Sequence, residues 1–106
     1  MSKYLLHGKY LAEGAKGLLK EGGSGRRDAI EKLIASQGGS VEGIYYAFGD
    51  TDIYVIADLP DNASAAAITL TIGTGGVTTA KATVLLTPEE LDEAAKKTPI
   101  YRTPGQ

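Results

Sequence analysis

The sequence predicts a single α+β domain in which helices cover one face of an antiparallel sheet. Three observations support this fold class. Short aromatic and aliphatic stretches alternate with helical patterns along the chain. Two of these stretches flank GDTD, a segment of turn-forming residues that is typical of a hairpin. The length of 106 residues is enough for one hydrophobic core but not for two.

The first part of the chain is predicted to be a strand followed by two helical segments. The strand covers residues 4–10, YLLHGKY, and apolar residues then recur at helical spacing over residues 11–21. The glycine-rich stretch KEGGSGRR separates this segment from a firmer helix over residues 26–37. The apolar face of that helix comprises Ala29, Ile30, Leu33 and Ile34, and two glycines at 38 and 39 end it.

Residues 41–48 and 53–59 are predicted to pair as a hairpin. We expect Asp50 and Thr51 to form the turn, which places Gly49 opposite Asp52. Side chains alternate along a strand, so one apolar set should lie under the helices: Ile44, Tyr46, Phe48, Ile53, Val55 and Ala57. The other face is mixed and comprises Gly43, Tyr45, Ala47, Tyr54, Ile56 and Asp58.

The second half is predicted to add a helix, a strand and a last helix. The alanine-rich segment after Pro60 favours a helix with Asp61 or Asn62 as its N-cap, although its isoleucines alternate with threonines as in a strand. Residues 75–86 favour a strand. A capping box of Thr87 and Glu90 begins the last helix. We expect one domain over residues 1–98 and an extended tail over residues 99–106.

This order is the ferredoxin-like βαββαβ pattern with an extra C-terminal helix, in which one face of the sheet is left bare. A bare face that carries Tyr45, Tyr54 and Ile56 exposes more apolar surface than a monomer usually tolerates. We therefore expect a homo-oligomer, first of all a homodimer, with this face in the interface.

Composition excludes several classes of function. The net charge of -2 and the pI of 5.3 argue against a nucleic-acid partner. The absence of cysteine excludes disulfides and thiolate metal sites, and one histidine, His7, cannot form a multi-histidine metal site within one chain. No apolar stretch has the length of a signal peptide or a membrane span. We expect a cytoplasmic protein with no cofactor and no membrane partner.

The stretch YYAFGDTDIYVIADLPD, together with the later VLLTPEELDEA, resembles the GYD-domain family. The glycine-rich stretch and DAIEKL fit the same pattern, so the resemblance covers all but the tail. It implies a dimeric α/β-barrel fold and no particular activity. Gly49 and Asp52 match the family's glycine and aspartate at the hairpin, whereas Thr51 stands where the tyrosine is expected.

The strongest site hypothesis places a polar pocket on the bare face, inside the oligomer. His7 would lie there with Tyr45, Tyr54 and Lys81, the histidine acting as an acid, base or ligand and the lysine holding an anion. The simpler interpretation is that His7 forms a hydrogen bond across the interface. Asp52 is a further candidate for the pocket, but an aspartate beside a turn more often binds its own backbone.

The stretch GGSGRR offers a second, weaker site. Ser24, Arg26 and Arg27 at the start of a helix could hold an anion, because backbone N–H groups and positive charge converge there. The spacing fits no known phosphate loop. We therefore favour a joint in which Gly22 and Gly23 end one segment, Ser24 caps the next, and both arginines are solvated.

Three candidate functions remain. The preferred one is a homo-oligomer that binds a small molecule, or acts in regulation, without turnover. The alternatives are a cofactor-free monooxygenase- or isomerase-like enzyme of the dimeric α/β-barrel type, and a PII-like trimer that binds nucleotides near the two arginines. The sequence shows no acid–base pair, which favours binding over catalysis.

Overall fold

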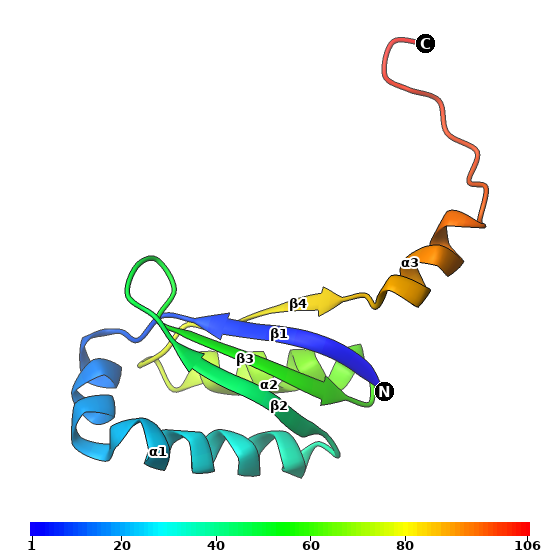
Figure 1. Ribbon diagram of the computed structural model, residues 1–106. Helices are drawn as coiled ribbons and strands as arrows, with labels where there is room; N and C mark the ends of the chain where they lie inside the picture. Colours follow the sequence, from blue (N-terminus) through cyan, green and yellow to red (C-terminus); the bar gives the residue numbers. More distant parts are fainter.

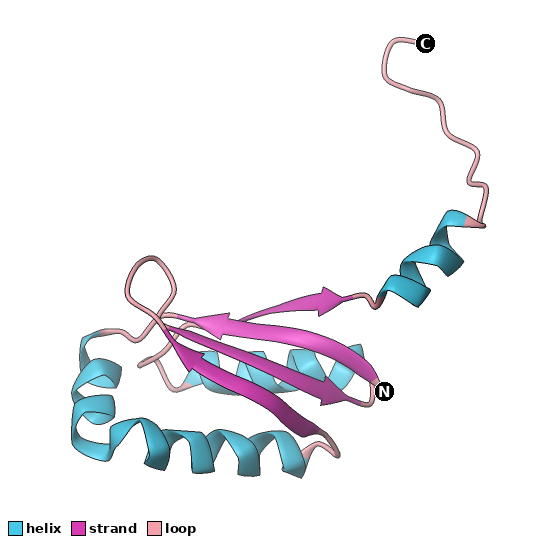
Figure 2. Cartoon of the chain, in the orientation of Figure 1, coloured by secondary structure: helices cyan, strands magenta, loops and turns pink.

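A computed structural model describes all residues, 1–106, and shows four strands and three helices (Figures 1 and 2). The elements in chain order are β1 (Ser2–Gly8), α1 (Ala12–Ser36), β2 (Ser40–Tyr46), β3 (Ile53–Leu59), α2 (Asn62–Thr74), β4 (Lys81–Leu85) and α3 (Pro88–Ala95). The strands form one sheet in the order β2-β3-β1-β4, and every neighbouring pair is antiparallel. The ferredoxin-like prediction with an added C-terminal helix is confirmed.

The core lies between the sheet and the two long helices, α1 and α2. In β3 every second residue is buried, from Ile53 to Leu59, because alternate side chains point toward the helices. The helices contribute one face each, with Ile34 and Ile68 almost fully enclosed. The phenol of Tyr4 reaches through this core and donates a hydrogen bond of 2.6 Å to Asn62 Oδ1, so its polar end is satisfied. The opposite face of the sheet carries no helix.

The hairpin differs from the expected register by two residues. Tyr45 pairs with Tyr54 and Tyr46 with Ile53, so the connection is a longer loop rather than a tight turn at Asp50 and Thr51. A shift of two preserves which side chains share a face, because the period of a strand is two. The shift does place Phe48 in the loop after β2, and its side chain is fully exposed there. The prediction that Phe48 lies in the core is therefore wrong.

The last strand is shorter than expected, since β4 begins only at Lys81. Residues 77–79 instead bind the chain just beyond β1: Leu11 N–H donates to the carbonyl of Val77 and Thr79 N–H to that of Lys9, both over 2.9 Å. The backbone of Thr79 passes so close to Gly8 that a Cβ there would overlap the Thr79 carbonyl oxygen. This glycine lets the segment cross the end of the sheet.

The predicted joint in the first helix is confirmed. Gly22 has φ 83° and ψ 160° and divides α1 into two segments that lie at a sharp angle to each other (Figure 1). A positive φ of this kind favours glycine. The second segment starts at Gly23, so Ser24 lies inside it and does not cap it. The expected Ser24 cap is therefore wrong.

The C-terminal part leaves the body of the molecule as an arm (Figure 1). Helix α3 begins with the predicted capping box between Thr87 and Glu90 and has no buried residue. No helix or strand follows it. None of the helices combines the length and the apolar character that crossing a membrane would require.

Candidate functional site

Four of the predicted site residues form a row across the bare face of the sheet. Tyr45 pairs with Tyr54, Tyr54 pairs with His7, and His7 pairs with Lys81, so each strand contributes one residue. The row follows from register alone, because directly opposed residues in an antiparallel sheet share a face. The structure thus brings together His7, Tyr45, Tyr54 and Lys81 as expected.

The aromatic members of this row remain open to solvent. Tyr45 keeps 66% of its surface exposed and Tyr54 37%. His7 packs against Tyr54 as a stacked pair, and its Nε2 lies 3.5 Å from the hydroxyl of Thr83 on β4. The row is therefore an ordered aromatic surface and not an enclosed pocket within one chain.

Along the strands from this row, near the start of β1 and the end of β3, one lysine on this face pairs with two carboxylates, which leaves a single net negative charge. Lys3 Nζ lies 3.0 Å from Asp58 Oδ1 and also binds the carboxylate of Glu42. The hydrogen bond to Glu42, followed by that to Asp58, raises the pKa of Lys3 above its ordinary value. Glu42 is the extra residue at a bulge in β2, which brings its side chain within reach.

Asp52 does not belong to the row. Its Oδ2 accepts a hydrogen bond of 2.9 Å from the backbone N–H of Tyr10 and lies 3.9 Å from Lys9 Nζ. Asp52 also donates its own N–H to the Gly8 carbonyl. The prediction that Asp52 lines the bare-face pocket is wrong, because it binds the chain that follows β1. It orders that chain and so sets the position of Tyr10.

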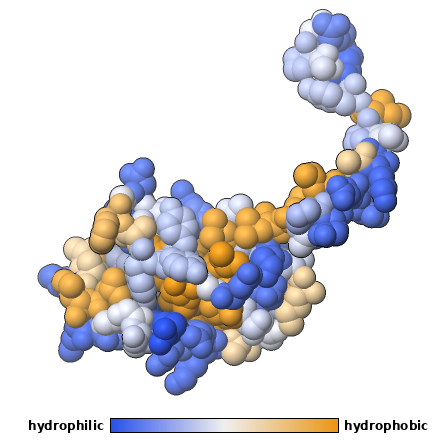
Figure 3. All heavy atoms as spheres, viewed as in Figure 1, coloured by the Kyte–Doolittle hydropathy of each residue, from blue (hydrophilic) through white to orange (hydrophobic).

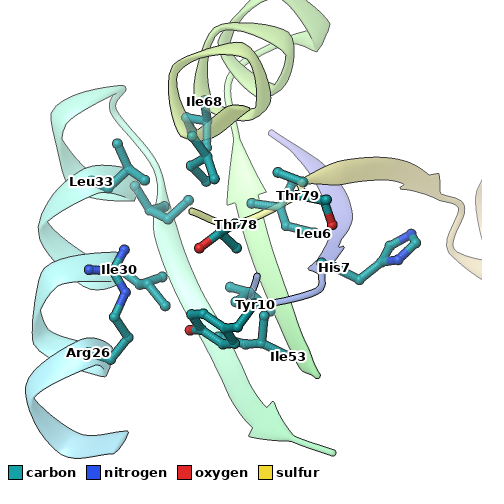
Figure 4. Close-up of a pocket in the computed structure, with 15 residues that line it drawn as sticks. Leu6, His7, Tyr10, Arg26, Ile30, Leu33, Ile53, Ile68, Thr78 and Thr79 are labelled. Carbon is teal, nitrogen blue, oxygen red and sulfur yellow. The ribbon is translucent and has the colours of Figure 1, made fainter. Parts of the chain in front are cut away.

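A cleft opens on the other side of the sheet, between α1, α2 and the ends of β1 and β3 (Figure 4). Its volume is about 50 Å³, enough for a few water-sized groups. Most of its walls are apolar, and the aliphatic residues among them are Leu6, Ile30, Leu33, Ile34, Ile53, Val55, Ile68, Ile72 and Ala80. The imidazole of His7, by contrast, points away from the cleft (Figure 4).

The polar groups of this cleft lie at its mouth. Arg26 extends from α1, and the hydroxyl of Tyr10 points toward that helix (Figure 4). Burial raises the pKa of Tyr10, and the nearby positive charge of Arg26 opposes that rise. Thr78, which forms an isolated bridge with Tyr10, adds a hydroxyl to the lining.

Tyr46 holds the kink of α1 in place beside this mouth. Its hydroxyl donates a hydrogen bond of 3.1 Å to the Gly23 carbonyl, and its ring lies where a Cβ on Gly23 would be crowded. Burial also raises the pKa of Tyr46, again opposed by Arg26. The joint in the glycine-rich stretch therefore positions Arg26 at the cleft.

The two arginines of GGSGRR have different environments. Arg27 is exposed and pairs with Glu31 at 3.7 Å, as expected of a solvated residue. Arg26 is half-buried and takes part in none of the five ion pairs of the structure. The prediction that both arginines are solvated is wrong for Arg26. Ser24 is exposed and does not line the cleft, so the three residues form no common anion site.

A second hollow of about 160 Å³ adjoins the mouth and shares Tyr10, Arg26 and Thr78 with the cleft. Glu13 and Glu21 line it from the first segment of α1. No group of three or more histidine, aspartate or glutamate side chains is placed to hold a metal ion. Sequence reasoning missed Tyr10 as a lining residue, because the sequence predicts it as the last residue of the first strand, whereas β1 ends at Gly8 and Tyr10 lies in the chain beyond it.

The fold and this pair of surfaces define a small ferredoxin-like α+β domain with a helix-side cleft and an open sheet face. A family model described as the GYD domain matches residues 4–95, and the chain belongs to the GYD-domain family. No curated protein and no solved structure shows significant similarity to the chain.

Proposed function

We propose that the protein is a homodimer that binds a small molecule in the helix-side cleft and does not turn it over. The observation that supports this function best is Arg26, a half-buried cation without an ion-pair partner at the mouth of an apolar cleft. Ligand sites in proteins are commonly concave and apolar, with a few polar groups that orient the ligand. A half-buried charge without a partner is costly, so a ligand group that pairs with it contributes binding free energy.

The lining of the cleft supports binding more than catalysis. General acid–base chemistry needs a donor or acceptor that titrates near the working pH and lies within hydrogen-bond reach of the substrate. The only histidine points to the opposite face (Figure 4), and Asp52 is engaged by the backbone of Tyr10. The cleft offers hydroxyls and a guanidinium, which hold a ligand but do not exchange a proton readily.

The open face supports the homodimer. Apolar residues gather in the middle of the body in Figure 3, and Tyr45, Tyr54 and Ile56 lie on the face that no helix covers. Lys3 pairs with both Glu42 and Asp58, so a second copy that covers that end of the face meets three charged groups with a net charge of only one. A two-fold interface uses the same patch on both copies, so the aromatic row meets its own counterpart.

Native mass spectrometry of the freshly purified protein tests both parts of this proposal. We expect a dimer mass, together with a small additional mass that is lost at higher collision energy. A monomer without any adduct, and no thermal stabilisation by any member of a metabolite panel, contradicts the proposed function.

A further inference from the structure

The charge pattern around the cleft mouth restricts what the cleft can bind. Arg26 is the cationic member of the lining, while Glu13 and Glu21 line the adjoining hollow. Glu13 pairs with Lys16 at 3.1 Å, whereas Glu21 takes part in none of the ion pairs. Because Lys16 compensates Glu13, Glu21 is the carboxylate left uncompensated beside Arg26. Its repulsion grows with the charge of an anionic ligand, which favours a singly charged ligand over one with several charges.

The hydrogen-bond donors at the mouth match a carboxylate. A guanidinium binds a carboxylate through two parallel N–H donors, and the phenol of Tyr10 and the hydroxyl of Thr78 line the same opening. A phosphate ester carries up to two charges and more acceptor oxygens, and it usually binds several backbone N–H groups at a helix start. Here the first residues of the segment after Gly22 lie outside the lining of the cleft.

The interior beyond the mouth selects an apolar body. Aliphatic side chains from both helices and the sheet, among them Ile30, Ile68 and Ile72, enclose a volume of about 50 Å³. Neither the helices nor the strands place a charged side chain there, so a polar group at this depth would lose its hydration without compensation. The volume admits a short aliphatic chain.

We propose that the cleft binds a small monocarboxylic acid, with the carboxylate held by Arg26 and Tyr10 and the apolar body between α1 and α2. This inference rests on the proposed function, which identifies the cleft as the ligand site. It adds the chemical class of the ligand and the residue that recognises its charge.

The test compares butanoate, hexanoate and octanoate with their primary amides, using ¹⁵N-resolved NMR titration of the intact protein. We expect the acids to shift the resonances of Tyr10, Ile30 and Thr78, and at least one acid to bind about tenfold or more tightly than its amide. Arg26→Gln should remove this preference, whereas Arg27→Gln, the neighbouring exposed arginine, should preserve it. Glu21→Gln should strengthen binding of the acid.

Arg26→Lys is a control for the case that Arg26→Gln folds poorly, because lysine keeps the positive charge but lacks the two parallel N–H donors of the guanidinium. We expect Arg26→Lys to bind the acid more weakly than the parent and more tightly than Arg26→Gln. Amides that bind as tightly as acids, or an unchanged preference in Arg26→Gln, overturn the carboxylate inference and leave a neutral-ligand site in the cleft. Inorganic phosphate that competes as well as the best acid also overturns it. A different outcome would overturn the proposed function itself: neither the acids nor the amides shift any resonance of the cleft, and the purified protein carries no bound small molecule.

Discussion

His7 stacks on Tyr54 across β1 and β3, with the ring centroids 6.2 Å apart and the ring planes inclined by 21°. This contact joins the two central strands on the face that no helix covers. Because Tyr45 lies directly opposite Tyr54, the aromatic surface continues onto β2. The pair therefore orders the centre of the surface through which we expect two copies to meet.

A positive charge at the centre of this surface should separate the dimer. We predict that Tyr54→Lys yields a monomer, because each copy would place a lysine against the other near Lys81. Light scattering coupled to size exclusion measures the mass. Leu19→Lys is the matched control, since Leu19 is 88% exposed on the first segment of α1, and its mass should remain that of the parent. A parent protein that is already monomeric refutes this interface.

Loss of the Asp52 carboxylate should destabilise the fold. We predict that Asp52→Ala lowers the free energy of unfolding by about 1–3 kcal/mol, because the N–H of Tyr10 loses a charged acceptor. Asp52→Asn keeps an acceptor oxygen, so its free energy of unfolding should fall by less than that of Asp52→Ala. Denaturant unfolding provides the measurement, and equal losses in both variants would mean that the hydrogen bond to Tyr10 contributes little.

Removing the charge of Arg26 should change the pKa of Tyr10 at the mouth of the cleft. Burial raises the pKa of Tyr10, and Arg26 opposes this rise, so Arg26→Gln should move the pKa of Tyr10 further upward. Absorbance of phenolate during alkaline titration, compared with that of a Tyr10→Phe variant, isolates this group. The raised pKa of Tyr10 also links stability to pH. Its contribution to the free energy of unfolding is present at a pH below the ordinary tyrosine pKa and is lost as the pH rises through the pKa of Tyr10 in the folded protein. An unchanged pKa in Arg26→Gln would place the guanidinium away from the phenol.

Asp61 should make the stability of α2 sensitive to acid. Its side chain accepts hydrogen bonds of 2.8 Å from the backbone N–H and the hydroxyl of Ser64, and these bonds lower the pKa of Asp61 below 3.8. Because the pKa of Asp61 is lower in the folded protein, the carboxylate stabilises the fold at a pH above the ordinary aspartate pKa. This stabilisation is lost as the pH falls through the pKa of Asp61 in the folded protein. Asp61→Asn keeps a capping oxygen without a titration. We therefore expect the melting temperature of the parent to fall relative to that of Asp61→Asn below about pH 4.

The core and the arm should differ sharply in their effect on stability. Ile34 is fully enclosed between α1 and the sheet, so Ile34→Ala should cost about 2–5 kcal/mol. Ile100 is fully exposed on the arm, and Ile100→Ala should change the free energy of unfolding by less than about 0.5 kcal/mol. Chemical denaturation measures both. A large loss in the arm variant would indicate that the arm is covered, for instance by a second copy.

The sequence by itself determined the order of the elements and the two faces of the sheet. Alternation along β3 separated Ile53, Val55 and Ala57 from Tyr54 and Ile56, and a register two residues off left this separation intact. The N-caps of α2 and α3, Asp61 and Thr87, could be predicted because capping is local and depends on a few neighbouring residues. The same periodicity placed His7, Tyr45, Tyr54 and Lys81 on one face, whereas their alignment in a row depends on the strand register.

Only the tertiary structure decided where the polar groups of the cleft meet. Arg26 and Arg27 are adjacent in sequence, yet the kink at Gly22 and the packing of α1 on the sheet turn the first toward the cleft and leave the second in solvent. Asp52 and Tyr10 are far apart in the chain and meet because β1 and β3 are neighbours. Contacts of this kind depend on how whole elements pack against one another, and no local pattern of residue types encodes them.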